Sequence, residues 1–131
     1  MQNHEEWLLI AEKDLKSAYQ LALDDFLCSV ALYHTQQSAE KALKGYLVYK
    51  NQPIKRVHDL VILIEDCAKL DFSFTALLSK ASTLKLYITQ SRDPDDYVEP
   101  SQDDVKNALK DAKYIFEFVK NKVSNAKCNF E

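Results

Sequence analysis

Glycine is almost absent from this chain, and its scarcity limits the folds that the chain can adopt. The 131 residues include one glycine, Gly45, and three prolines. Strand-rich folds need many tight turns, and glycine and proline supply the backbone angles of those turns. Glycine-rich phosphate loops and dinucleotide fingerprints need several glycines at fixed spacing. The sequence therefore excludes both kinds of phosphate loop and favours an all-α chain.

The size and charge of the chain narrow the choice further. A mass of 15.1 kDa corresponds to one domain. Hydrophobic residues make up 47% and charged residues 28%, a balance that excludes wholesale disorder. The net charge is −3, whereas a protein that grips nucleic acid through its phosphates usually carries the opposite sign.

Apolar residues recur every three or four positions along most of the chain, which predicts helices. The first helix is expected over residues 5–23, with Asn3 and Glu6 spaced as a capping box. The second is expected from Phe26 to about Lys50, where Gly45 marks a close helix crossing. Its predicted apolar stripe consists of Phe26, Val30, Tyr33, Leu43 and Leu47.

The second half of the chain predicts three more helices. Pro53 ends the second helix, and the third is expected over residues 57–70. Its apolar run 60–64 is also compatible with a buried strand. Ser73 is the expected cap of the fourth helix, and Ser101 with Asp104 resembles a capping box for the fifth.

Together these elements predict one domain, an up-and-down bundle of about five helices over residues 1–123. The connections are short, which favours antiparallel neighbours. Residues 124–131 lose the helical periodicity and are expected to form a frayed C-terminal tail.

The three cysteines and the N-terminus predict a cytoplasmic protein. Cys28 and Cys67 lie in apolar stretches and are expected to be buried, whereas Cys128 lies in the polar tail. No Cys-x-x-Cys pair is present, so a zinc knuckle is excluded. The N-terminus has no basic region with an apolar core, and the longest apolar run is too short to cross a membrane.

Three segments of the chain, taken in their order along the sequence, resemble the HEPN family, the higher eukaryotes and prokaryotes nucleotide-binding domain. The most specific is the Gln-x-x-Glu-Lys-x-x-Lys stretch of residues 37–44. It is preceded by Trp7 and by Asp14-Leu15, and followed by His58-Asp59-Leu60. The resemblance extends from Trp7 to about Val123.

The resemblance implies a helical bundle that is often a homodimer. Prokaryotic members are frequently encoded beside a minimal nucleotidyltransferase, in pairs that can act as toxin and antitoxin. Other members are metal-independent RNA endonucleases that carry Arg-x(4–6)-His at a dimer cleft.

This chain departs from the nuclease pattern. The positions after Arg92 where histidine is required hold residues 97–99, Tyr-Val-Glu. The corresponding positions after Arg56 hold residues 60–62, Leu-Val-Ile. Both arginines therefore lack the histidine of the motif. Non-nuclease relatives often have Arg-Tyr-Pro after the fourth helix, where this chain has Arg92-Asp93-Pro94.

A polar strip on the second helix is the first candidate site. Gln37, Glu40, Lys41 and Lys44 share one face because steps of three and four residues superpose on a helix. Lys41 and Lys44 would meet phosphates, and Gln37 would bond a base edge. The alternative is a solvated face with a Glu40–Lys44 ion pair.

The loop after the fourth helix is the second candidate. Arg92 supplies a planar fork for phosphate, and Tyr97 supplies a ring for stacking. The same loop carries four carboxylates, which would repel a polyanion unless a divalent cation such as Mg²⁺ intervenes. The alternative is an acidic turn before the positive end of the fifth helix, in which Arg92 neutralises its neighbours.

The histidines are secondary candidates. His58 beside Asp59 suggests a general base, but adjacent residues at a helix start do not face each other. Asp59 therefore fits better as a first-turn carboxylate, and His58 as a cap or a bond across the bundle. His34 is expected to be a packed or interface residue, and no metal site or catalytic residue is predicted.

The sequence leaves three functions open. The first is a homodimeric partner subunit of a minimal nucleotidyltransferase that requires no cofactor but binds ATP or another nucleotide. The second is an RNA endonuclease toxin, which the missing motif disfavours. The third is a structural adaptor with no ligand.

Overall fold

The computed structural model describes residues 3–92 and 99–128, with side chains described for 3–85 and 99–124. Five α-helices account for most of these residues, and no strand occurs among them, which confirms the predicted all-α fold. The helices are α1 (His4–Leu21), α2 (Cys28–Tyr49), α3 (Leu60–Ala68), α4 (Leu78–Arg92) and α5 (Gln102–Cys128). Two 3-10 segments, η1 (Asp25–Leu27) and η2 (Phe72–Leu77), precede α2 and α4.

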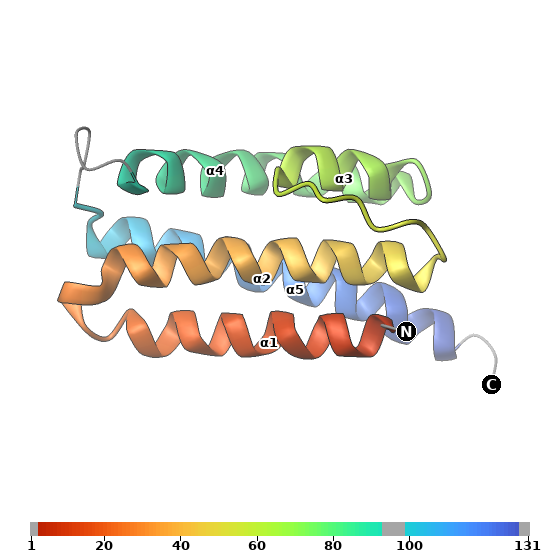
Figure 1. The fold of residues 1–131 in the computed structure, drawn as a ribbon, viewed down its shortest axis with the longest axis horizontal. Coiled ribbons are helices and arrows are strands. Elements are labelled where there is room, and N and C mark those ends of the chain that lie inside the picture. Colours follow the sequence, from red (N-terminus) through yellow and green to blue (C-terminus); the bar gives the residue numbers. More distant parts are fainter. Residues whose placement is uncertain (1–2, 93–98, 129–131) are drawn as a thin grey trace.

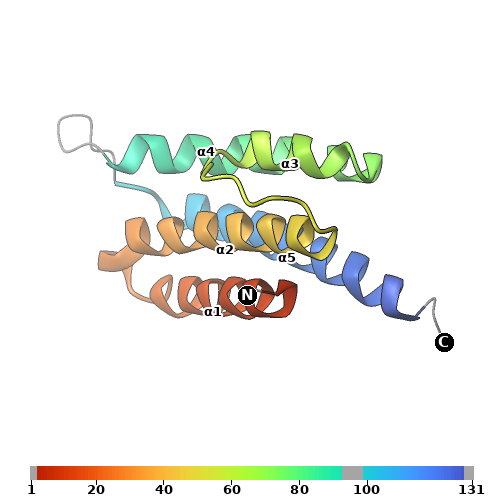
Figure 2. The same ribbon diagram turned by 45° about the vertical axis from the view of Figure 1, so that its right-hand side comes forward.

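Helix α2 is the centre of the bundle. It packs against each of the other four helices. Figure 1 shows α2 in front of α5, with α1 on one side and α3 and α4 on the other. The same layers are visible in Figure 2, where the segment between α2 and α3 crosses from one layer to the next. Among the described residues, no helix is long and apolar enough to span a membrane.

The predicted capping box of α5 is confirmed, and at α1 the predicted cap Asn3 is confirmed by one of the two bonds of such a box. The Asn3 side chain accepts a hydrogen bond from the Glu6 backbone N–H at 2.9 Å and so starts α1. At the start of α5, the Asp104 N–H donates to Ser101 Oγ at 3.0 Å. The Ser101 N–H donates back to Asp104 Oδ2 at 3.2 Å. Each bond satisfies a backbone donor that the first helical turn leaves unpaired.

Several predicted helix ends differ from the structure. The α-helix α4 starts at Leu78, because Asp71, and not Ser73, caps the 3-10 segment η2 that precedes it. The apolar run 60–64 is helical, although α3 is shorter than predicted and begins after its cap Asp59. Helix α5 continues to Cys128, beyond Val123 where the predicted bundle ends.

The predicted apolar stripe of α2 is wrong in its first half. Phe26, which lies in η1, is 86% exposed, and Val30 and Tyr33 on α2 are also exposed. Leu43 and Leu47 are buried as predicted. The residues that face the core in the first half are mostly small, with Leu32 as the large side chain among them: Cys28, Ala31, Leu32, Thr35, Ser38 and Ala39. Small side chains on this face let α1 approach closely, whereas Phe26, Val30 and Tyr33 are turned outward.

Gly45 lies at a close crossing of α1 and α2, as predicted. A Cβ atom at this position would lie 3.1 Å from Trp7 Cβ and 3.6 Å from the His4 carbonyl oxygen. Nearby, the Ser38 hydroxyl donates to the Ala11 carbonyl at 2.8 Å and joins the same two helices. Glycine is therefore used here for its lack of a side chain, although its φ angle is ordinary for a helix.

The two cysteines whose side chains are described, Cys28 and Cys67, are buried, as expected. Cys67 packs in the core with its Sγ 3.7 Å from the Leu43 carbonyl oxygen. Burial, and to a smaller extent the charge of Asp66, raises the pKa of the Cys67 thiol to about 12. A thiol that stays protonated at neutral pH is unreactive, so Cys67 acts as a small apolar residue.

We expect Gly45→Val to lower the free energy of unfolding by about 2 kcal/mol, because its side chain would overpack the crossing with α1. In Gly45→Ala, a gain in helix propensity of about 1 kcal/mol offsets the tighter contact, so we expect a small net change. Urea unfolding followed by circular dichroism measures both. Gln37→Val is the control for a β-branched residue on α2, and equal stability of the two valine variants would refute the crossing.

Candidate functional site

The polar strip of α2 is organised around one buried carboxylate. Glu40 is fully buried, and its Oε2 atom lies 3.2 Å from Lys44 Nζ and 3.6 Å from Lys41 Nζ. His58, from the segment before α3, places its Nδ1 3.2 and 3.1 Å from the two carboxylate oxygens. We call Glu40, Lys41, Lys44 and His58 the Glu40 cluster.

The cluster meets the requirement that a buried charge be paired. Removing a carboxylate from water is costly unless cations and hydrogen bonds replace the lost hydration. Lys44 is itself buried, so this i,i+4 pair lies inside the protein and not on a solvated face. The pair that the sequence suggested is present, but the solvated surface suggested with it is not. Lys44 is occupied by Glu40 and is poorly placed to meet a phosphate.

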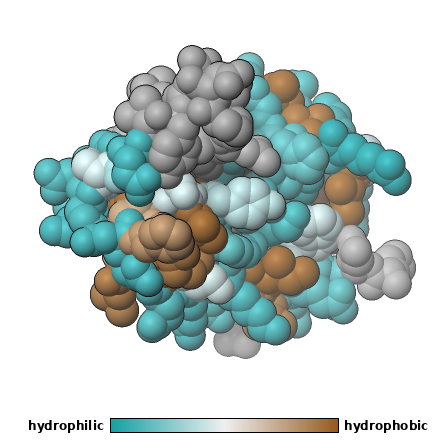
Figure 3. All heavy atoms as spheres, turned by 60° about the vertical axis from the view of Figure 1, so that its left-hand side comes forward, coloured by the Kyte–Doolittle hydropathy of each residue, from teal (hydrophilic) through white to brown (hydrophobic). Residues whose placement is uncertain are grey.

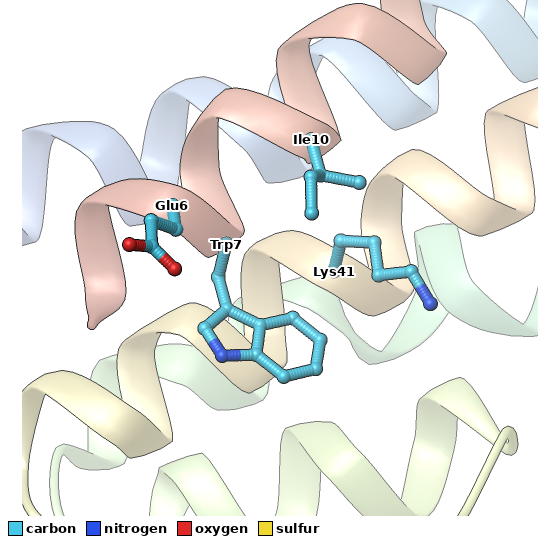
Figure 4. Close-up of a pocket in the computed structure, with 4 residues that line it drawn as sticks. All are labelled: Glu6, Trp7, Ile10 and Lys41. Carbon is cyan, nitrogen blue, oxygen red and sulfur yellow. The ribbon is translucent and has the colours of Figure 1, made fainter. Parts of the chain in front are cut away.

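Lys41 is the more accessible cation of the cluster. Its side chain is 25% exposed, and its Nζ lies 5.8 Å from the centre of the Trp7 ring. Glu6, Trp7, Ile10 and Lys41 line a cavity of about 240 Å³ between α1 and α2 (Figure 4). The Trp7 Nε1 atom is buried and has no hydrogen-bond partner among the described residues. An aromatic ring, an apolar wall and an ammonium group therefore meet at one hollow.

The remaining predicted residues fall into three groups. Gln37 lies one turn before Lys41 on α2 and is partly exposed. Arg92 is the last residue of α4, but its side chain lies outside the described ones. Tyr97 and the acidic residues around it also lie outside the described residues. The structure thus brings Lys41 and Lys44 together with Glu40, and says nothing of the Arg92–Tyr97 pairing.

Asp59 and His58 have separate structural contacts. Asp59 Oδ1 accepts from the Val61 N–H at 2.9 Å, and Oδ2 lies 3.0 Å from Lys85 Nζ. The hydrogen bond from Lys85, aided by the backbone N–H groups, lowers the pKa of Asp59. Asp59 is therefore the cap of α3. His58 bonds across the bundle to Glu40, so the two residues do not form a dyad.

His34 is a packed residue that links α1 and α2. Its Nδ1 lies 3.0 Å from Asp14 Oδ1, and its ring meets Tyr33 edge-on at 5.5 Å. No group of three or more potential metal ligands occurs among the described residues. The contacts of His34 are those of a structural histidine.

Trp7 is the residue that sequence reasoning missed at this site. In the sequence Trp7 counts only toward the resemblance to the HEPN family, whereas in the structure it lines the cavity beside Lys41. The burial of Glu40 was also missed. Its lysine neighbours at i+1 and i+4 gave a partial signal, but the third partner, His58, is distant in sequence.

An exposed apolar corner lies at the other end of α2. It consists of Leu23, Phe26 and Val30, and Leu23 and Phe26 are 82% and 86% exposed. Figure 3 views this end of the molecule and shows hydrophobic side chains gathered on its surface. An apolar group this exposed on a small protein is typical of an association surface.

We expect Glu40→Ala to lower the free energy of unfolding by about 3–5 kcal/mol, because buried Lys44 would lose its counter-charge. Replacing both residues in Glu40→Met/Lys44→Met should recover most of that loss, since no buried charge would remain. Urea unfolding measures the three proteins. If the double variant is no more stable than Glu40→Ala, the unpaired charge of Lys44 is not the reason for the lower free energy of unfolding.

Comparison with known proteins agrees with this architecture. The family model described as "HEPN domain" matches residues 4–122. The structure of ST0689, described as an archaeal HEPN homologue, is 29% identical with a TM-score of 0.74 and covers 94% of this chain and 99% of its own. TT1696 from Thermus thermophilus is 28% identical with a TM-score of 0.79, with coverage of 93% and 99%. No curated protein matches the chain. Because the family model covers nearly the whole sequence, this chain belongs to the HEPN family.

Proposed function

We propose that this HEPN protein is a homodimeric partner subunit of a minimal nucleotidyltransferase, in a toxin–antitoxin-like pair, and that it binds a nucleotide at the Trp7–Lys41 cavity. The observation that supports nucleotide binding is the placement of Lys41 Nζ over the Trp7 ring, 5.8 Å from its centre, beside an open hollow. An aromatic face stacks on any base, and a lysine ammonium attracts phosphate.

The size and charge of the site define what it can hold. A cavity of about 240 Å³ accommodates one part of a nucleotide, such as the base, while the rest lies along the surface of α2. Glu40 carries one negative charge against two lysines, so the Glu40 cluster has a surplus positive charge for a phosphate. We expect Gln37, one turn from Lys41 on α2, to bond the ligand. ATP is the first nucleotide to test, with and without Mg²⁺.

We expect ATP titrated into ¹⁵N-labelled protein to shift the amides of residues 37–44 and the indole signal of Trp7. Lys41→Ala should weaken ATP binding by roughly ten- to a hundredfold, because a charge-assisted contact contributes about 1.5–3 kcal/mol. Lys110→Ala removes the same charge from an exposed position on α5 and is the control. Unchanged affinity in Lys41→Ala would refute this site, and the absence of any shift at millimolar ATP would refute nucleotide binding.

The partner role is supported by the apolar corner of Leu23, Phe26 and Val30. Side chains exposed to this extent lose contact with water when another protein covers them, and burial of one phenylalanine contributes about 1.5–3 kcal/mol. The corner lies at the α1–α2 connection, whereas Trp7 is in the first turns of α1, so a partner can bind without covering the cavity.

We expect Phe26→Ser to reduce co-purification with a minimal nucleotidyltransferase expressed from the neighbouring gene. Phe72 is similarly exposed but lies in η2, so Phe72→Ser is the matched control for loss of a surface phenylalanine. Equal recovery of the partner by both variants would refute the corner as its docking surface. RNA cleavage by the purified protein would instead favour the endonuclease alternative.

A further inference from the structure

The outward side of α1 carries charged and apolar residues in a regular order. Glu6, Ile10 and Lys13 follow one another at helical spacing, with Leu9 beside Ile10. Leu9 and Ile10 are 52% and 46% exposed, and Glu6 and Lys13 are exposed as well. Among the described side chains, neither Glu6 nor Lys13 has an ion-pair partner. We call these four residues the α1 stripe.

The α1 stripe is complementary to itself. Its midpoint falls between Leu9 and Ile10, with Glu6 three residues before Leu9 and Lys13 three residues after Ile10. If a second copy of α1 packs antiparallel about this midpoint, Leu9 meets Ile10 of the second copy. Glu6 then meets Lys13 of the second copy. A two-fold axis repeats each contact, so two unlike charge pairs flank an apolar centre.

The α1 stripe is continuous with the Trp7–Lys41 cavity. Glu6 and Ile10 belong to both, and Glu6 is the acidic residue among the four that line the cavity. In Figure 4 the Glu6 carboxylate and the Lys41 ammonium lie on opposite sides of Trp7. A carboxylate on one wall repels the phosphates that Lys41 attracts. A lysine from a second copy would neutralise that wall.

We propose that the α1 stripe is an interface with a second copy of this chain, packed antiparallel, and that Lys13 of the second copy pairs with Glu6 and completes the cavity. The interface rests on the homodimer proposed above, and its effect on the cavity rests on the proposed nucleotide binding. Stable interfaces bury about 1,200–2,000 Å² in total, and one pair of helices lies at or below the lower limit. The dimer is therefore expected to dissociate on dilution into the micromolar range.

Charge reversal tests the interface directly. Sedimentation equilibrium of the wild type over a range of concentrations should show a monomer–dimer equilibrium. Glu6→Lys and Lys13→Glu should each raise the dimer dissociation constant at least tenfold, because each places like charges together twice. The double variant Glu6→Lys/Lys13→Glu should restore dimerisation. An equimolar mixture of the two single variants should form a heterodimer, since both of its pairs are again unlike.

Matched controls separate this interface from general charge effects. Glu12→Lys reverses a negative charge on α1 at a position outside the α1 stripe. Lys106→Glu reverses a positive charge on α5. Both controls should dimerise as the wild type does, and unchanged melting temperatures would show that all variants fold. A wild type that is monomeric at every concentration would overturn both the interface and the proposed homodimer. A dimer insensitive to Glu6→Lys and Lys13→Glu would overturn the interface alone.

Binding of ATP distinguishes this inference from the proposed function. Lys13→Glu should weaken ATP binding at least threefold, although Lys13 does not line the cavity of its own chain. If ATP binds equally well to Lys13→Glu, the second copy does not complete the cavity. If ATP does not bind the wild-type dimer while charge reversal acts as expected, the proposed nucleotide function fails and the interface stands.

Discussion

The close packing of α1 on α2 sets the positions of most other features of this protein. Gly45 lets the two helix backbones approach at the first turns of α1, and alanines continue the contact along both helices. The bond from Ser38 to the Ala11 carbonyl and the contact of His34 with Asp14 fix the rotation of α2. Because of that rotation, Lys41 lies beside Trp7, and the bulky residues before and within the first half of α2 face solvent.

Glu40 extends this arrangement to the third helix. Its carboxylate holds two lysines of α2 and also the ring of His58, which lies just before α3. The residue next to His58, Asp59, caps α3 and contacts Lys85 of α4. One buried charge thus connects α2 to the segment just before α3, where the layer of α3 and α4 begins. Because Glu40 is paired with two lysines, it also leaves one surplus positive charge on this part of α2, in a chain whose net charge is −3.

The sequence predicted what depends on neighbours along the chain. Capping boxes involve residues three positions apart, and helical periodicity is local, so the capped starts of α1 and α5 and the all-α class were within reach. The face of α2 was mistaken because periodicity gives weight to large apolar residues such as Phe26, whereas the crossing needs small ones. The partnership of Glu40 with His58 spans 18 residues and depends on how the segment before α3 returns to α2.

The candidate site shows the same division. Lys41 and Lys44 were correctly placed near each other, because i and i+3 meet on a helix. The sequence did not predict how deeply each lysine is buried. Because Lys44 is the more buried of the two, it pairs with Glu40, whereas Lys41 remains accessible. Trp7 comes from another helix, so its place beside Lys41 follows only from the crossing at Gly45. Arg92 and Tyr97 remain predictions, since the side chain of Arg92 and the whole of Tyr97 lie outside the described residues.

The chemistry of the two exposed surfaces argues that they have different partners. The apolar corner of Leu23, Phe26 and Val30 offers apolar area that a partner can bury. The exposed charges within it, Asp24 and Asp25, have the same sign and would repel a copy of the same surface. The α1 stripe offers less area, yet its order of charges matches an antiparallel copy of itself and mismatches a parallel one. Apolar area chiefly contributes affinity, whereas charge order contributes specificity. The α1 stripe therefore fits the role of a surface that selects a second copy of this chain. The corner fits the role of a surface that binds a different protein, one that carries a complementary apolar pocket.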